Sequence, residues 1–329
     1  GRLAPTYCVS TPPLVGPSRA LHLDLFDRLG EKVGIVFVYS EGYYVDIGAH
    51  VFPVKKYRLV YQQLRERGIL GEDPIEPAPA SEADLLLVHE REYVEDLMHA
   101  RATQRTSSSE LPISREIVQA FLLAAGGTIR ACEEALEGGC AVNLSGGFHH
   151  AFPDHAEGFC YVNDMAVAIR RVQQRKEGMR VAVIDCDLHQ GNGTAFIFKD
   201  DESVYTFSIH QRDLYPLKQD SSWDIHLTSG VGDEEYLDHL EKAVPAIIER
   251  FKPEFVLYQA GADPYEGDQL GDLRLTIAGL KRRDDFIFGE CKKHGIPAAA
   301  LLGGGYAGNT NDTVTIHVNT CLAAAECFG

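Results

Sequence analysis

Short apolar runs alternate with longer amphipathic stretches along most of the chain. The apolar runs are rich in Val, Ile and Ala and cover residues 33–40, 84–89, 140–145, 181–187, 204–210, 255–263 and 297–305. Apolar positions with helical spacing lie between them, near 55–68, 91–101, 115–137, 162–177, 234–251, 276–294 and 311–327. Strands of this kind, alternating with helices, are typical of a parallel sheet that is covered on both faces. The pattern therefore predicts an α/β fold.

Polar segments rich in Pro, Ser and Gly separate some of these elements. They cover residues 71–82, 103–112 and 210–222, and we expect them to form surface loops. None is long enough to predict a linker between domains, and the chain shows no internal repeat. We therefore expect one domain over residues 31–329, preceded by an N-terminal extension over residues 1–30.

The charge of the chain narrows the classes of partner. Its 329 residues include 31 Lys and Arg against 48 Asp and Glu, which gives a net charge of −17. A protein of this charge repels the phosphate backbone of nucleic acids, so direct nucleic-acid binding is not expected. The same field would attract a cationic substrate, such as a lysine-rich peptide or a polyamine.

The cysteines indicate a reducing compartment, and the hydropathy of the chain gives no sign of a membrane span. The 8 cysteines contain no CxxC pair and are scattered through a chain large enough to fold without disulfides. No apolar run reaches the ~18 residues that a membrane span needs. We expect a cytoplasmic or nucleocytoplasmic protein, and a targeting segment removed before residue 1 would be compatible with this sequence.

Polar side chains follow four of the predicted strands, at the point where each strand ends. Because the carboxyl ends of parallel strands meet at one edge of the sheet, ligands bind there and these side chains should lie close together. The residues in question are His149 and His150 after the run at 140–145, Asp185, Asp187 and His189 around the end of 181–187, Asp263 after 255–263, and Tyr306 after 297–305.

Three of these residues predict a metal site. Asp187 and His189 come from one strand end and Asp263 from another. Three protein ligands with an open position are typical of catalytic zinc, and two carboxylates with one imidazole would also suit Fe(II). A single Asp-x-Asp at a strand end is more often a turn or capping feature. Four polar strand ends together favour the metal site.

The motifs "GGFHHA", "GFCYVND", "IDCDLHQGNG", "AGADPYEGDQLGDL" and "GGGY" occur in this order between residues 146 and 306, within a resemblance that covers roughly residues 33–325. In that order and spacing they resemble the zinc-dependent histone deacetylase superfamily, which includes acetylpolyamine amidohydrolases and acetoin-utilisation proteins. Details such as "AGGTI" and "RRDDFIF" are most similar to class IV histone deacetylases and their bacterial relatives. The resemblance implies the three-layer arginase-deacetylase fold, with a central eight-stranded, mostly parallel sheet flanked by helices.

The resemblance also assigns ions to the strand ends. It gives the metal ligands as Asp187, His189 and Asp263. Asp185 would not bind this metal. It would accept a hydrogen bond from His149 and belong to a nearby potassium site, together with Asp187, His189, Ser208 and Ile209.

Hydrolysis of an acyl-lysine amide is the reaction that the resemblance implies. His150 would act as general base, with His149 as its electrostatic partner, and Tyr306 would donate a hydrogen bond to the oxyanion. Asn192 stands where many members of the superfamily have an aspartate behind the general base. A neutral amide would still orient His150, but it should leave the imidazole less basic.

Five residues correspond to substrate contacts in the superfamily. Phe159 and Tyr215 would form the walls of an acyl-lysine tunnel, Leu270 its rim, and Gly158 would offer a backbone carbonyl to the substrate. His50 would lie near the mouth, although a solvated loop histidine is an equally good interpretation. Aromatic and Leu side chains of this kind are otherwise ordinary core residues.

These patterns support several functions. The first is a zinc-dependent lysine deacylase acting on proteins, for which the sequence leaves open whether acetyl or also long-chain fatty acyl groups are removed. The second is an amidohydrolase of acetylpolyamines or other small cationic amides. A non-catalytic acyl-lysine binding module is a weaker alternative, because binding alone needs no general base. A binuclear manganese hydrolase related to arginase is disfavoured by the single set of ligands.

Overall fold

The computed structural model describes residues 35–329, and the predicted extension at 1–30 lies outside the described residues. The described part forms one parallel sheet whose strands are β1 (Val36–Val38), β2 (Cys140–Asn143), β3 (Val181–Asp185), β4 (Val204–Gln211), β5 (Trp223–Leu227), β6 (Phe255–Gln259) and β7 (Ala298–Leu301). Every residue of β2, β3, β6 and β7 is buried. This confirms an α/β fold whose central strands are covered on both faces.

The strands lie in the order β1-β2-β7-β6-β3-β4-β5. The four strands that the sequence analysis singled out are β2, β7, β6 and β3, and they are consecutive neighbours in this order. All pairs are parallel. Their carboxyl ends therefore lie at one edge of the sheet.

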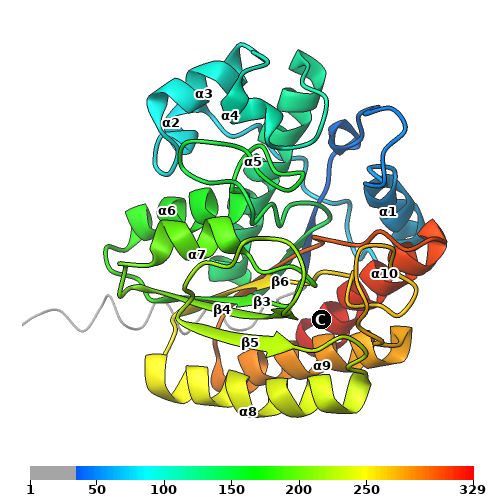
Figure 1. The fold of residues 1–329 in the computed structure, drawn as a ribbon. Helices are drawn as coiled ribbons and strands as arrows, with labels where there is room; N and C mark the ends of the chain where they lie inside the picture. Colours follow the sequence, from blue (N-terminus) through cyan, green and yellow to red (C-terminus); the bar gives the residue numbers. More distant parts are fainter. Residues whose placement is uncertain (1–34) are drawn as a thin grey trace, which may run out of the picture. The chain divides into compact units, whose positions relative to one another are not determined.

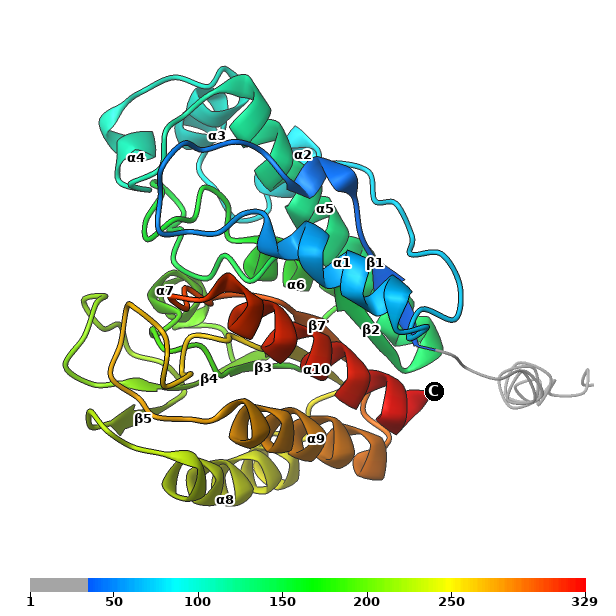
Figure 2. The ribbon, with the colours of Figure 1, turned by 90° about the vertical axis from the view of Figure 1, so that its right-hand side faces the viewer.

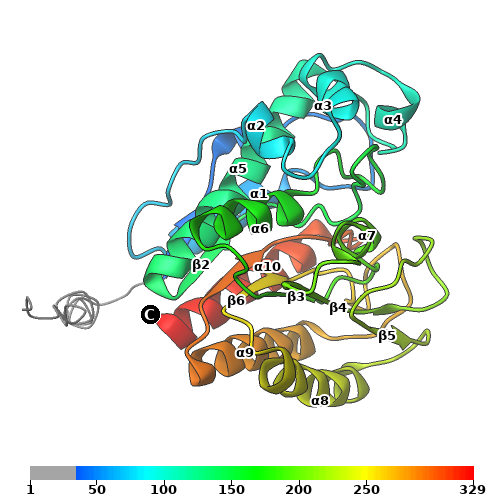
Figure 3. The ribbon, with the colours of Figure 1, turned by 90° about the vertical axis from the view of Figure 1, so that its left-hand side faces the viewer.

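Helices cover both faces of the sheet. Their bounds are α1 (Lys56–Glu66), α2 (Glu82–Leu85), α3 (Arg91–Met98), α4 (Gln104–Ser107), α5 (Arg115–Gly138), α6 (Asp164–Arg175), α7 (Asn192–Phe198), α8 (Asp233–Phe251), α9 (Ile277–His294) and α10 (Thr310–Phe328). Figure 1 shows α8 and α9 below the strands and α6 above them. Figure 2 shows α10 between α1 and α9, with which it packs. Figure 3 shows α5 and α6 on the side of the sheet away from α8 and α9.

Local sequence signals set the ends of the long helices. The side chain of Ser114 accepts a hydrogen bond from Ile117 N at the start of α5, and Gly139, with φ 90°, follows its last residue. Thr276 caps α9 in the same way, and Gly295 ends it in the left-handed conformation. Hydroxyl caps and terminal glycines are ordinary helix boundaries, which explains why the predicted helix ranges agree closely with the observed ones.

Several segments differ from the sequence-based prediction. The helix α4 lies within the predicted loop at 103–112, and α7 was not predicted. The apolar run at 84–89 was expected to be a strand, but Ser81 and Asp84 form a capping box that begins α2, and a turn follows. No element was predicted at residues 223–227, but this segment pairs with β4 as the edge strand β5. The described part has seven strands, whereas the resemblance implies eight.

The structure also shows the state of the cysteines and the hydropathy of the helices. Seven cysteines, at 132, 140, 160, 186, 291, 321 and 327, are free within residues 35–329. None of the helices in this range combines the length and the apolar composition that a membrane crossing requires.

Candidate metal centre and active site

The candidate site is built on one row of paired residues across the sheet. Asn143 pairs with Leu301, Leu301 with Gln259, Gln259 with Asp185, and Asp185 with Ser208. Because these residues are level with one another, the loops that follow β2, β7, β6 and β3 leave the sheet at the same height. The register explains how polar residues more than a hundred positions apart in the sequence reach one place.

Asp187, His189 and Asp263 converge there as a buried group. One potential ligand atom from each lies within 4.8 Å of the other two. His189 Nδ1 is 3.3 Å from Asp187 Oδ1 and 3.2 Å from Asp263 Oδ2. The structure thus brings together the three residues that the sequence predicted as metal ligands.

The surroundings of these three residues fit a cation. Burial and the neighbouring charge of Asp187 raise the pKa of Asp263 to about 7, so two carboxylates at this distance oppose each other's ionisation. A cation among them would offset that cost. Gly261 and Gly304 leave the space open, since a Cβ at either position would lie within 2.7 Å of Asp187 Oδ2. The donor set suits zinc or Fe(II).

Backbone amides orient the two carboxylates. Gly304 N donates to Asp187 Oδ2 at 3.0 Å, and His189 N donates to Asp187 Oδ1 at 3.0 Å. Leu188 N donates to Asp263 Oδ1 at 3.0 Å. Hydrogen bonds from such backbone N–H groups hold a metal-ligating carboxylate in place before a metal binds.

His149 and His150 form a second buried group beside the first. His149 Nδ1 donates to Asp185 Oδ2 at 2.7 Å, as the sequence analysis expected for Asp185. His150 Nδ1 lies 2.7 Å from Asn192 Oδ1, and the two Nε2 atoms lie 3.1 Å apart. The two imidazoles therefore have different partners, an acid for His149 and an amide for His150.

These partners separate the pKa values of the two imidazoles. Burial alone would lower the pKa of His149, but the carboxylates of Asp185 and Asp187 outweigh it and raise that pKa to about 9. Burial and the positive charge of His149 lower the pKa of His150 well below its ordinary value. A charged and a neutral imidazole side by side are the arrangement expected of an electrostatic partner and a base.

Tyr306 is held by a residue to which the sequence analysis gave no role. The backbone N–H of Tyr306 donates to Asp268 Oδ2 at 2.7 Å, and Leu270 N donates to Asp268 Oδ1 at 2.9 Å. Burial and the charges of Asp187 and Asp263 raise the pKa of Tyr306 well above its ordinary value, so its hydroxyl keeps its proton. Asp268 thus positions both a hydrogen-bond donor and the predicted rim residue.

A cavity of about 320 Å³ opens onto this group of residues. Its lining residues are Glu110, His150, Gly158, Phe159, His189, Leu214, Tyr215, Leu270 and Tyr306. Four of the five predicted substrate contacts are among them. His50 is not, because its ring packs edge-on against Phe159, with 4.8 Å between centroids, and it lines a separate groove. A substrate contact through His50 stays a prediction.

A second, much smaller cavity continues from the first. It shares His150, Gly158, Phe159 and Tyr306 with the larger cavity and also reaches Asp187, Gly303 and Gly304. Its volume is about 20 Å³, which is room for roughly one water molecule.

The residues of the predicted potassium site lie on β3 and β4 and just after the end of β3. Asp185 and Ser208 are paired in register on β3 and β4. Asp185 Oδ1 accepts from Asp187 N at 3.1 Å, and Ser208 Oγ lies 2.9 Å from His210 Nδ1. Ile209 follows on β4 and is buried. Potassium binding by these residues and by the carbonyls of Asp187 and His189 stays a prediction.

Besides Asp268, three residues near the site were missed by the sequence analysis. Lys56 is fully buried, and its ammonium donates to the carbonyl of Gly303, beside the second cavity. Burial lowers its pKa to about 8, against the attraction of Asp263 and Asp187. Glu110 lines the large cavity, and Glu157 bonds to Asn192. A lysine at the start of an amphipathic helix and two loop glutamates carry no signal that separates them from solvated surface residues.

The chain is similar to several known proteins. Residues 50–321 match the histone deacetylase domain. The chain is 41% identical over 300 residues to an uncharacterised protein of Picosynechococcus, covering 90% of this chain and all of that protein. It is 34% identical to histone deacetylase 2 of Arabidopsis thaliana, covering 85% of this chain and 76% of that protein. The crystal structure of an HDAC homologue from Aquifex aeolicus superposes with a TM-score of 0.77 at 26% identity, covering 88% of this chain and 84% of that chain.

Proposed function

The chain belongs to the histone deacetylase family and is a hydrolase, and on this premise we propose that it hydrolyses the amide of N6-acyl-lysine in proteins or peptides. The observation that carries the proposal is that His150, His189 and Tyr306 line the same cavity. A base, a metal ligand and a hydroxyl donor around one reacting amide are the parts that amide hydrolysis needs.

Asp187, His189 and Asp263 would hold the metal ion in this proposal. Zinc or Fe(II) bound there would polarise the acyl carbonyl and lower the pKa of a water molecule. His189 lines the large cavity, and Asp187 lines the smaller cavity that shares four residues with it.

The remaining steps fall to the chain's own side chains. His150 donates from Nδ1 to Asn192, so its Nε2 carries a lone pair. This atom would take the proton of the attacking water and return it to the leaving amine. His149, tied to Asp185, remains charged beside it and favours the negative charge that develops on the carbonyl oxygen. Tyr306 donates its hydroxyl hydrogen to the same oxygen.

The cavity has the form that a lysine side chain requires. Phe159 and Tyr215 give it aromatic walls, and Leu214 and Leu270 add apolar surface. An extended methylene chain gains most from such walls, while its amide reaches the polar groups below. Tyr215 is itself 41% exposed, so the mouth of the cavity is open to a peptide.

The second cavity favours a short acyl group. With about 20 Å³ beyond the shared residues, it has room for the methyl of an acetyl group but not for a fatty acyl chain. Forcing further methylenes into a packed site costs about 1–3 kcal/mol. We therefore propose acetyl-lysine as the preferred substrate, rather than the long-chain acyl-lysine that the sequence left open.

The test is hydrolysis of one peptide carrying acetyl-, octanoyl- or myristoyl-lysine by the metal-loaded protein. We expect turnover of the acetyl peptide, with kcat/KM at least about tenfold above the myristoyl peptide. His150→Ala should lower kcat about 10²- to 10⁴-fold while binding of the peptide is retained. Absence of turnover on all three peptides would contradict the deacylase function. Faster turnover of the myristoyl peptide would contradict only the acyl-length proposal.

A small cationic amide is the second candidate, and Glu110 is the observation that favours it. Its side chain lines the cavity, where a carboxylate would attract the free ammonium of an acetylpolyamine. Acetylputrescine and the acetyl-lysine peptide should be compared at equal enzyme concentration. A higher kcat/KM for acetylputrescine would replace the peptide with the small amide as the substrate class.

A further inference from the structure

The side-chain amide of Asn192 lies between two partners of opposite character. Its Oδ1 is 2.7 Å from His150 Nδ1, and its Nδ2 donates to Glu157 Oε1 at 2.8 Å. The three side chains form a chain of hydrogen bonds that runs from the imidazole to a carboxylate. Asn192 is buried, whereas the side chain of Glu157 is 23% exposed.

The carboxylate decides which way this amide faces. The two ends of an Asn side chain have nearly the same shape, so packing alone does not distinguish one orientation from the other. With Oδ1 toward His150, the Nδ1 atom donates and Nε2 keeps its lone pair for the reaction. A reversed amide would place Oδ1 against Glu157 Oε1, which are two acceptors, and would turn the donor Nδ2 toward His150. Glu157 makes that orientation unfavourable.

The same carboxylate oxygen also holds a wall of the cavity. Tyr215 donates its hydroxyl to Glu157 Oε1 at 3.0 Å, and its ring lies 5.3 Å from the His150 ring, measured between centroids. One oxygen atom thus accepts from the amide behind the base and from the aromatic side chain in front of it. The position of the wall and the orientation of the base depend on the same group.

The backbone around Glu157 is fixed independently of these bonds. Glu157 N donates to Cys160 O at 3.2 Å, and Cys160 N donates to Glu157 O at 2.9 Å. Gly158 and Phe159 between them have φ values of 51° and 63°, a left-handed conformation that is uncommon for phenylalanine. Phe159 N donates to Ser109 O at 2.9 Å. The loop therefore delivers the carboxylate to a set place.

We propose that Glu157 is a positioning residue for the hydrolytic reaction, acting on His150 through Asn192 and aligning Tyr215 by the same oxygen. The inference rests on the proposed function, in which His150 is the general base. The negative charge sits one hydrogen bond farther from the imidazole than it would if residue 192 were itself a carboxylate. Hydrogen bonds to an ionised acceptor are stronger than neutral ones, and successive bonds polarise one another.

The test is a double-mutant cycle on the metal-loaded full chain, with kcat and KM measured across pH on the acetyl-lysine peptide. Glu157→Gln keeps the shape and removes the charge, and we expect kcat to fall about threefold to tenfold with little change in KM. Glu157→Ala should lower kcat further. Asn192→Asp alone places two carboxylates in contact and should also lower kcat.

Combining Glu157→Gln with Asn192→Asp is the decisive arm. The glutamine amide can donate to the new carboxylate, which removes the repulsion and returns an acid to the base. We expect the double variant to exceed Asn192→Asp in kcat by at least about tenfold, and its pH profile to shift back toward that of the unaltered chain. If the kcat changes of the two single variants simply multiply in the double variant, the inference is overturned. A Glu157 that only anchored its loop would act independently of the charge at residue 192.

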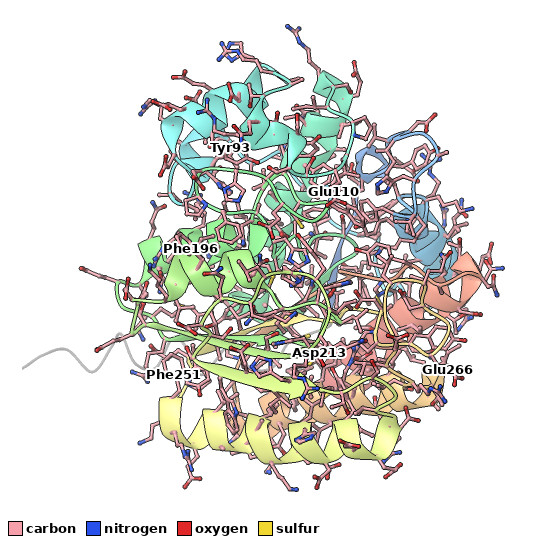
Figure 4. All side chains as sticks on the ribbon, in the orientation of Figure 1. Tyr93, Glu110, Phe196, Asp213, Phe251 and Glu266 are labelled. Carbon is pink, nitrogen blue, oxygen red and sulfur yellow. The ribbon has the colours of Figure 1, made fainter. Side chains whose placement is uncertain are left out.

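Asp213→Asn is the matched control. Asp213, labelled in Figure 4, lies in the same loop as Tyr215, is 73% exposed, and bonds only with Arg212 among the described side chains. Removing its charge should leave kcat within about twofold. An equal loss in this control and in Glu157→Gln would show that general electrostatics, and not positioning, is responsible.

A second readout does not need turnover. In the metal-loaded chain with ¹⁵N-labelled histidine, the NMR signals of His150 should report a proton on Nδ1, and Glu157→Ala should give a mixture of tautomers. Identical spectra in the two proteins would overturn the inference. If the unaltered chain hydrolyses no acyl-lysine peptide, the proposed function is contradicted, and the spectra still decide whether Glu157 sets the orientation of His150.

Discussion

Replacing Tyr306 with Phe isolates the contribution of one hydroxyl group. No hydrogen bond to this hydroxyl is present within residues 35–329, whereas the backbone of Tyr306 is held through Asp268. The ring should therefore stay in place, and the free energy of unfolding should change by less than about 0.5 kcal/mol. The substitution should therefore cost the folded protein little stability, and it removes one hydrogen-bond donor from the proposed transition state.

The magnitude follows from the environment of that donor. A preorganised hydroxyl that donates to a developing oxyanion contributes about 3 kcal/mol, which corresponds to a decrease in kcat of roughly 150-fold. Because the bond forms only as the oxyanion develops, KM should change little. The assay is steady-state hydrolysis of the acetyl-lysine peptide, with thermal unfolding and metal content measured on the same preparation. A kcat within threefold of the unaltered chain, with metal content and stability intact, would refute the assigned role.

Three further predictions concern the metal, a glycine and a buried histidine. Chelation should abolish turnover and lower the unfolding temperature, since an ion at a hundredfold excess over its Kd contributes about 2.7 kcal/mol to stability. Adding back zinc or Fe(II) should restore turnover and the unfolding temperature. Unchanged stability and activity after chelation would argue against a resident ion. Gly304→Ala should reduce bound metal measured by elemental analysis, because a Cβ there would lie 2.5 Å from Asp187 Oδ2, and full metal content would contradict this crowding. Burial lowers the pKa of His89 to about 4 in the folded chain. As the pH falls, this imidazole therefore binds a proton in the unfolded chain before it does so in the folded chain. The free energy of unfolding should fall by at most about 3 kcal/mol as the pH drops from 6.5 toward 4. Denaturant titrations should show a smaller fall in His89→Gln, and an equal slope in both proteins would exclude His89 as the cause.

The order of helices and strands was predictable because it depends on local patterns. The strands at the centre of the sheet are buried on both faces. The long helices α5 and α9 each have a hydroxyl cap and a terminal glycine, such as Ser114 and Gly139 for α5. The exception at 84–89 has the same kind of cause. Its apolar residues resemble a strand, but the capping box of Ser81 and Asp84 favours a helix start.

The edge strand β5 was not predictable in this way. Residues 223–227 are mostly only partly buried, so they lack the continuous apolar character of the central strands. What makes them a strand is pairing with β4. An edge strand depends on a neighbour for its hydrogen bonds, and the sequence of the strand alone does not identify that neighbour.

The sequence by itself determined which reactive residue types stand at the strand ends, because these can be read without coordinates. Two carboxylates and an imidazole predicted a cation, and the structure places Asp187, His189 and Asp263 together. Only the tertiary structure decided which other side chains reach them. The contacts of Glu157 with Asn192 and of Lys56 with Gly303 span 35 and 247 positions, and the cavity of about 20 Å³ is bounded by residues from several strand ends and loops. Such features depend on the register of the sheet and on the paths of its loops, which no local pattern records.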